Sequence, residues 1–518
     1  MKTYLKTILS FTLISFTFSC SEKDILELRP INAVAIELAF SSPSLINASM
    51  NGMYNAAAIG IYNGAPGAPN GGRGYIWGAA FVQQGDCRGE DVVNTAGFYQ
   101  LTYQANYDAG TANNTYYWID GYRLINRCNL IIEGVTDAVS KNIITSSLGN
   151  NYIGEARYLR AITHFEMLTY FARPYNFTVT ASHPGIPYRE VGVDTEDEIN
   201  AEKLKGRNTV AECYAKVLAD LDFAENNINV AGNKFRATKQ AAIAFKTRVF
   251  LHKRDWDNVV LEGAKLTGLT LTTTPAAAFT FPNANVETIF AIAHGPTGGQ
   301  NPGVNAALAS MYKNRALICI SPIIWRDPMW LNDDKRRENG VMTTVNSGVV
   351  LTNKYTDVTN STDPAPVMRY AEVLLNMAEA NARKTTPNLT AALTQLNTVR
   401  NRSLAFPLTQ TYLASSFATA TDMVGAILKE RRIEFICEGR RWSDIHRLQD
   451  DNLFPINGIP AKLANGNPAA SNFVLGTPYS GPLTTPAIIG SDFRFLWPIP
   501  LLETTVNPVL AAQQNPGW

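Results

Sequence analysis

The sequence predicts a mainly α fold: a tetratricopeptide-like helical-repeat scaffold that carries long irregular loops and a few short β-hairpins. Between residues 118 and 268, apolar residues recur at helical spacing in consecutive segments rich in alanine and aromatic residues. The 34-residue tetratricopeptide consensus is not cleanly present. Short β-like runs replace the helices over 275–366, and helical spacing resumes over 368–448. The proline-rich residues 450–518 are expected to wrap irregularly around the scaffold.

Helix positions follow from apolar stripes and capping signals. One face of the clearest helix has residues at alternating spacings of four and three: Trp118, Tyr122, Ile125, Asn129 and Ile132. A capping box at Thr209 and Glu212 predicts the start of a later helix. The other predicted helices cover residues 155–172, 210–228, 238–252, a shorter segment ending near 268, 368–384, 389–402 and 422–448; the β-like runs are 288–293, 317–320 and 349–355.

The stretch from Lys429 to Leu448 combines helical apolar spacing with dense charge, and Gly439 predicts an interruption within it. Glu430, Glu434 and Glu438 follow one another at i,i+4 spacing, so a solvated helix would stack like charges. Bidentate pairing of these carboxylates with arginine forks would relieve the repulsion. We therefore predict a packed ionic lattice, with a solvent-exposed charged face as the alternative that composition leaves open.

The first twenty residues predict the compartment. Lys2 and Lys6 precede a short apolar run that ends at Ser19 and Cys20. The run is too short to cross a hydrocarbon core of ~30 Å as a helix, so residues 1–19 are predicted to be a signal peptide. Cys20 is then the predicted lipid attachment site that anchors the protein to a membrane, with ordinary secretion as the alternative.

Four stretches, together with this leader, resemble the SusD/RagB family of nutrient-uptake outer-membrane lipoproteins. The motifs are EARYLRA (155–161), RYAEVLL followed by EA (369–380), ERR–E–EG–RW–D (430–444) and WPIP–E–NP–QNPGW (497–518). They occur in the family's order and extend the resemblance to the last residue. The motif residues that we assign to folding, and not to ligand binding, are Arg157, Arg369, Glu372, Glu430, Arg431, Arg432, Glu434, Glu438, Arg441, Trp442 and Trp497.

The resemblance implies a SusD-like fold, divided here into a signal peptide (1–19), an N-terminal helical-repeat region (20–270) and a C-terminal SusD/RagB region (271–518) in one structural unit. It further implies a non-catalytic glycan-binding lipoprotein on the outer face of the outer membrane, which delivers oligosaccharide to a SusC-like TonB-dependent transporter. RagB-type relatives imply peptide capture as an alternative. Family binding residues lie in variable loops, so none is transferred to this chain.

Composition and motifs favour binding over catalysis. The chain has 45 Lys and Arg against 44 Asp and Glu, and this balance gives no electrostatic case for a nucleic-acid partner. Nucleotide-binding loops, a nucleophile elbow and a zinc-binding histidine spacing are all missing, so no cofactor and no metal are expected. Five cysteines besides Cys20 are predicted to be buried thiols. A secreted glycoside hydrolase or lyase remains an alternative, because the acidic residues are too numerous for any carboxylate pair to be diagnostic.

Aromatic residues interleaved with amides between Phe98 and Trp118 predict a sugar-binding platform. Sugar rings stack their C–H faces on aromatics, and their hydroxyls need a few fixed polar partners. The alternative is that Tyr99, Tyr103 and Tyr107, at i,i+4 spacing, face a core. The preceding glycine-rich loop and two later tryptophans would complete the platform. The predicted ligand-binding residues are Trp77, Asp86, Arg88, Tyr99, Tyr103, Asn113, Trp325 and Trp330.

Overall fold

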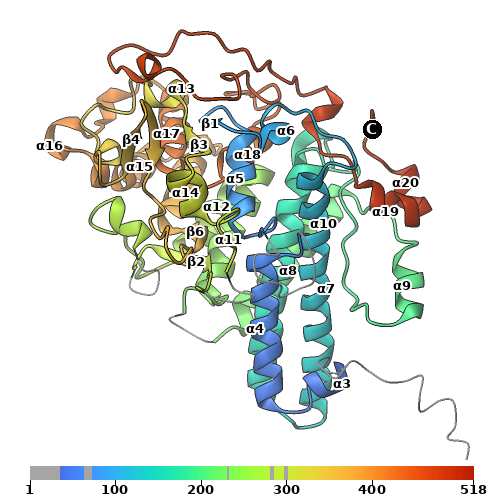
Figure 1. Ribbon diagram of the computed structural model, residues 1–518. Coiled ribbons are helices and arrows are strands. Elements are labelled where there is room, and N and C mark those ends of the chain that lie inside the picture. Colours follow the sequence, from blue (N-terminus) through green and yellow to red (C-terminus); the bar gives the residue numbers. More distant parts are fainter. Residues whose placement is uncertain (1–35, 63–72, 230–232, 281–284, 297–300) are drawn as a thin grey trace, which may run out of the picture.

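The computed structural model describes residues 36–62, 73–229, 233–280, 285–296 and 301–518, and it confirms the mainly helical prediction. Four long helices lie side by side at the base of the molecule (Figure 1). They are α4 (Pro43–Ile59), α7 (Ala112–Ser140), α8 (Ser146–Phe171) and α10 (Val210–Asn227). The predicted signal peptide and Cys20 lie outside the described residues.

The helical scaffold continues because each helix packs on one that precedes it in the chain. The helix after α10 packs on it, and the later helices extend the series as far as α17. The series therefore has the neighbour-to-neighbour organisation expected of stacked helical repeats. These helices are α11 (Lys239–Lys253), α12 (Trp256–Ala264), α14 (Tyr370–Arg383), α15 (Leu389–Ser403) and α17 (Ala420–Glu434).

Capping residues set several helix boundaries. Thr209 and Glu212 form the predicted capping box at the start of α10, each side chain accepting a hydrogen bond from the other's backbone N–H. Helix α8 begins nine residues before the prediction, at Ser146. The hydroxyl of Thr145 accepts a hydrogen bond from the N–H of Leu148 and caps the helix there.

The predicted interruption near Gly439 is confirmed. Helix α17 ends at Glu434, and α18 (Arg441–Arg447) starts only after a turn. Within that turn Cys437 and Gly439 have positive φ angles of 62° and 73°, a conformation that an α-helix cannot contain. The turn redirects the chain, so the charges of residues 429–448 point at several neighbouring elements.

Within the described residues the strands form three antiparallel pairs, and one of them, β4 (Thr343–Asn346) with β5 (Val349–Thr352), is a hairpin. Ser347 and Gly348 connect these two strands with φ angles of 50° and 84°, as a tight two-residue turn requires. The other pairs join segments far apart in the sequence. They are β1 (Val92–Asn94) with β3 (Ile318–Ile320), and β2 (Thr288–Ile292) with β6 (Ala365–Arg369).

The C-terminal segment wraps the scaffold, as predicted, and crosses the upper side of the molecule (Figure 1, red). Two short helices near its end, α19 (Leu501–Val506) and α20 (Pro508–Ala512), are not apparent in the sequence. The amide of Asn515 fixes the end of the chain by donating to the carbonyls of Phe171 (2.9 Å) and Trp497 (2.8 Å).

The five cysteines of the described residues are free and buried, as predicted: Cys87, Cys128, Cys213, Cys319 and Cys437. Short helices occupy the connections between the long ones. Among the helices that the structure describes, none combines the length and the apolar composition needed to cross a membrane. The short helices are α3 (Ile36–Ala39), α5 (Ala79–Cys87), α6 (Gln100–Tyr103), α9 (Glu196–Glu202), α13 (Pro322–Trp325) and α16 (Pro407–Gln410).

Candidate functional site

The charged residues of α17 and α18 form a buried ionic lattice, which confirms that prediction over the solvent-exposed alternative. Glu430, Glu434 and Glu438 are each about 3% exposed or less. Their partners come from other segments: Arg336 contacts Glu430 (2.6 Å), and Arg369 contacts Glu434 (3.1 Å) and Glu438 (2.8 Å). The stacked like charges are therefore neutralised from outside the helix.

The arginines of the same segment pair in turn with carboxylates of other helices. Arg431 and Arg447 both contact Asp444, and Arg447 also binds Glu379 of α14 (2.8 Å). Arg441, together with Arg432, pairs with acidic residues that directly follow α5. A buried ion requires such pairing because water is absent to solvate it.

Burial by itself opposes ionisation of Glu434. The guanidinium groups of Arg402, Arg369 and Arg336 outweigh this effect and hold its pKa below the usual range. The carboxylate therefore stays charged at neutral pH, and all three arginines keep their partner. The lattice thus joins α17 and α18 to neighbouring segments through buried ion pairs.

The predicted aromatic platform is wrong as an exposed surface, because the structure places its rings in the core. Trp77, Tyr99, Tyr103 and Trp330 are each at most 1% exposed. Trp77 donates to the hydroxyl of Thr163 on α8 (2.9 Å). A ring without exposed area cannot stack on a sugar, so the core-facing alternative for the i,i+4 tyrosines is the correct one.

The polar members of that set are also buried, and they hold parts of the scaffold together. Asp86 accepts hydrogen bonds from the Tyr312 hydroxyl (2.5 Å) and the Gly439 N–H (2.8 Å). Arg88 lies 3.8 Å from the ring of Trp442 and donates to the carbonyl of Phe495 (2.6 Å). Both residues therefore bind elements of the family motifs, and neither faces solvent.

Trp325 and Trp330 lie together, 5.3 Å apart, but away from the surface. Arg337 stacks on both rings at 4.4 and 4.3 Å, and the Trp325 indole N–H donates to the carbonyl of Phe473 (3.1 Å). Asn113 is 8% exposed, and its side-chain oxygen accepts a hydrogen bond from the Tyr75 hydroxyl (3.1 Å). Two of the eight predicted residues lie behind the surface described next: Asn113, through Tyr75, and Tyr99, whose ring centroid is 4.9 Å from that of Phe98.

Half-buried aromatic rings reach the surface near Asn113 and Tyr75. We call Tyr62, Phe98 and Tyr116, with Arg73 and Arg315, the ring cluster. Tyr62 and Tyr116 lie 4.8 Å apart at an angle of 73°. The Arg73 guanidinium lies between two rings, 3.9 Å from Tyr62 and 4.5 Å from Phe98, and that of Arg315 lies 5.6 Å from Phe98. The cluster thus combines apolar ring faces with cationic donors.

The aromatic residues of the ring cluster lie in segments that the sequence marks as rich in aromatics or glycine, but none of them is among the predicted ligand-binding residues. Tyr62 is in the glycine-rich segment, and Phe98 and Tyr116 lie in the aromatic run. Little in the sequence separates exposed from buried rings in this run, since Phe98 is followed by the fully buried Tyr99 and Tyr116 by the fully buried Tyr117. Exposure along such a run depends on what packs behind it, and the sequence does not contain that information in local form.

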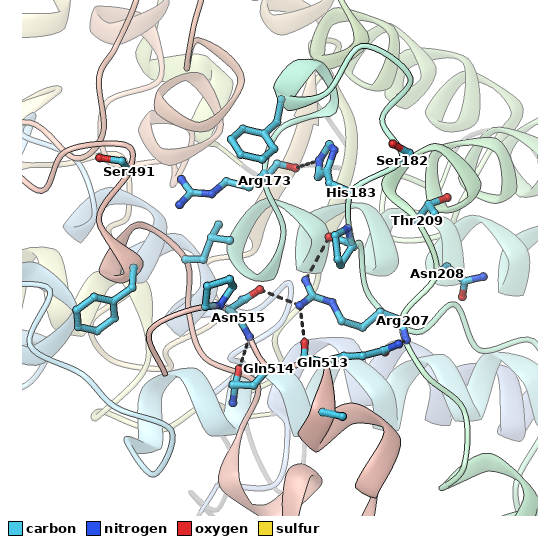
Figure 2. Close-up of a pocket in the computed structure, with 16 residues that line it drawn as sticks. Arg173, Ser182, His183, Arg207, Asn208, Thr209, Ser491, Gln513, Gln514 and Asn515 are labelled. Atoms are coloured by element: carbon cyan, nitrogen blue, oxygen red, sulfur yellow. Dashed lines mark hydrogen bonds between the residues drawn. The ribbon is translucent and has the colours of Figure 1, made fainter.

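A separate feature is a pocket of about 560 Å³ beneath the C-terminal segment (Figure 2). Its walls come from the segment after α8, from residues 207–209 and from residues 491–516. The His183 ring donates to the Arg173 carbonyl (3.2 Å) and accepts from the Thr178 hydroxyl (2.9 Å), so it is neutral. Burial lowers its pKa in agreement. No sequence signal pointed to this pocket, because its walls are far apart along the chain.

Two family models match separate parts of the chain. Residues 331–518 match the model of the SusD family. Residues 77–251 match a SusD-like model described as starch-binding and associating with the outer membrane. A curated relative, a SusD-like protein of Formosa agariphila, is 25% identical over 140 residues, which cover 27% of this chain and 24% of that protein.

Solved structures match nearly the whole chain. A SusD superfamily protein from Bacteroides fragilis has a TM-score of 0.74 at 25% identity, covering 91% of this chain and 99% of its own. A SusD-like carbohydrate binding protein from Bacteroides vulgatus has a TM-score of 0.70 at 20% identity, covering 91% and 98%. The second likeness concerns the fold alone.

Proposed function

Because this chain belongs to the SusD family, we propose that it is a non-catalytic glycan-binding lipoprotein on the outer face of the outer membrane, which delivers oligosaccharide to a SusC-like TonB-dependent transporter. The description of the matched model supports a carbohydrate ligand. The leader sequence and Cys20 support lipid anchoring.

The observation that carries the proposal is the ring cluster. Tyr62 and Tyr116 meet at a steep angle, so a bound oligosaccharide would follow a bent path across them. Arg73 supplies donors between the rings for sugar hydroxyls. Apolar faces with a few fixed polar groups are the usual lining of a small-molecule site.

The same residues explain why binding without cleavage is proposed. Glycoside hydrolysis uses two carboxyl groups on either side of the scissile bond. The five side chains that define the ring cluster are aromatic or cationic, so they can hold a sugar ring but do not supply the pair of carboxyl groups that protonates the leaving oxygen and attacks the anomeric carbon or activates a water. The guanidinium groups of Arg73 and Arg315 have no acceptor atom, so they act as hydrogen-bond donors only.

Affinity electrophoresis against a panel of neutral polysaccharides tests the proposal. We expect retardation by at least one glycan, and at least fivefold weaker binding when Tyr62→Ala and Tyr116→Ala are combined. Phe406→Ala is the matched control, because this ring is 63% exposed and is not part of the ring cluster. If the double variant is retarded as strongly as the wild type, the ring cluster does not bind the ligand.

Two further measurements separate the alternatives. Release of reducing sugar during overnight incubation with the retained glycan would overturn the non-catalytic reading. Retention by a peptide column with no response to any glycan would favour peptide capture. Transport is tested by affinity purification from outer membranes: co-purification of a TonB-dependent β-barrel is expected, and its repeated absence would contradict delivery to a transporter.

A further inference from the structure

We propose that the pocket beneath the C-terminal segment binds a sugar ring that carries an anionic substituent, a carboxylate or a sulfate ester. The pocket is lined by Arg173 and Arg207, and none of the described residues that form its walls is acidic. Figure 2 shows Arg173 on one side of the cavity, extending toward Ser491, and Arg207 with Asn515 on the other. The inference rests on the proposed function only in taking the ligand to be a sugar.

Arg207 supplies positive charge, and none of the described residues forms an ion pair with it. Its guanidinium donates to neutral acceptors only: the carbonyls of Gly185 (2.6 Å), Gln513 (2.9 Å), Phe171 (3.0 Å) and Pro184 (3.2 Å), and the side-chain oxygen of Asn515 (2.8 Å). These bonds occupy its donors and fix it in the wall. Burial lowers its pKa to about 10, so it is still charged at neutral pH. Its field in the pocket is therefore permanent and favours an anion.

Arg173 supplies the donors for direct contact. In the described part of the chain the side chain of Arg173 donates one hydrogen bond, to the Gly490 carbonyl. Burial lowers the pKa of Arg173, and the attraction of Asp450 opposes this effect without forming an ion pair. The ring of Phe177, 5.4 Å from the guanidinium carbon, helps to hold it in place. The remaining N–H groups match the forked geometry of a carboxylate or sulfate oxygen pair.

The rest of the pocket suits a pyranose ring. Phe177 and Phe493 line it and are 49% and 40% exposed, so both retain free ring faces for C–H stacking. The hydroxyl of Ser182 adds a hydrogen-bonding group to the wall, whereas the side chains of Asn208 and Thr209 bond the start of α10. At about 560 Å³ the pocket falls within the ordinary range for small-molecule sites.

Isothermal titration with three sugars of matched ring type tests the inference: galacturonate, galactose 6-sulfate and neutral galactose. We expect at least one anionic sugar to bind, with an affinity that falls as salt rises, and galactose to bind at least tenfold more weakly. Arg173→Gln should weaken binding of the anionic sugar at least tenfold. The two anionic sugars distinguish a carboxylate ligand from a sulfate ester.

Arg127→Gln is the matched control, since Arg127 also donates to one backbone carbonyl, that of Gly52, and also has its pKa lowered by burial. Phe177→Ala serves as a second test variant if Arg173→Gln fails to fold, and it should weaken the anionic sugar while leaving the melting temperature nearly unchanged. The inference is overturned if neither anionic sugar binds, or if Arg173→Gln and Phe177→Ala bind the anionic sugar as tightly as the wild type. Neutral glycan retardation by the ring cluster would survive that result, so the two proposals fail separately.

Discussion

Arg369 and Glu438, which are 69 residues apart in the sequence, form a bidentate buried pair. The Nε of Arg369 donates to one carboxylate oxygen at 2.9 Å and its Nη2 to the other at 2.8 Å. Both residues belong to family motifs, so this pair joins two motif segments that lie far apart in the sequence. Lys354 adds a third bond to the same carboxylate at 2.7 Å.

Replacing Arg369 with Met should lower the free energy of unfolding by about 3–5 kcal/mol, because it leaves Glu434 and Glu438 buried with too few partners. Urea unfolding followed by circular dichroism measures the change. Lys141→Met is the control: its pair with Asp137 is more than half exposed and contributes at most about 1 kcal/mol. Equal midpoints for both variants would contradict a stabilising lattice.

Gly439→Ala should destabilise the protein by more than the ~1–2 kcal/mol expected from left-handed backbone strain alone. A Cβ at this position would lie 2.9 Å from the Cα and the carbonyl oxygen of Val82, and backbone atoms cannot move aside cheaply. Gly268→Ala isolates the strain, since Gly268 has φ +77° and open space around it. The two variants should therefore differ in thermal midpoint, and equal losses would exclude a clash at Val82.

The pH dependence of stability should become shallower in Asp120→Asn. Burial raises the pKa of Asp120 to about 7, against a smaller opposing effect of Arg123. The folded state then holds a proton that the unfolded chain has already released above its ordinary pKa near 3.8. Stability from this group is present at acid pH and is lost as the pH rises toward 7.

Between pH 5 and pH 8 the wild-type protein should lose about 2 kcal/mol more than the Asp120→Asn variant. Urea unfolding of both proteins at the two pH values measures the difference, and comparison within the pair cancels the contributions of all other groups. Parallel pH profiles would show that Asp120 titrates normally.

Trp77→Ala should lower the free energy of unfolding by about 3–5 kcal/mol, since the ring fills the core and its N–H is bonded to Thr163. The folded fraction should still bind glycan like the wild type in affinity electrophoresis. A stable variant that has lost glycan binding would restore Trp77 as a ligand contact.

The five buried thiols should not react with a thiol reagent in the folded protein. Burial raises the pKa of Cys213 and of Cys319 to about 12, so neither forms a thiolate at neutral pH. For a chain beginning after residue 20, titration with Ellman's reagent should detect less than one thiol before urea is added and five afterwards. Rapid reaction without urea would show that a cysteine is accessible.

Local sequence patterns predicted most of the scaffold. The capping box at Thr209 and the turn at Gly439 fall where they were expected, because each depends on a few consecutive residues. Residues 365–369 were assigned in part to a helix but form β6, since pairing with β2 outweighs the local preference. The partners in the ionic lattice could not be predicted from local patterns either, because they lie far apart in the sequence.

The sequence by itself determined the positions of most long helices, because apolar period and capping chemistry are properties of short segments. It predicted a charge lattice over residues 429–448 but left a solvent-exposed charged face open, because the partners of these charges lie elsewhere in the chain. Only the tertiary structure decided which aromatic rings reach solvent. Tyr99 and Tyr103 are buried because distant residues cover them; the Tyr103 hydroxyl, for instance, bonds the carbonyl of Leu463 at 2.9 Å. The pocket lined by Arg173 and Arg207 exists for the same physical reason: burial and cavities arise from contacts between parts of the chain that the sequence keeps far apart.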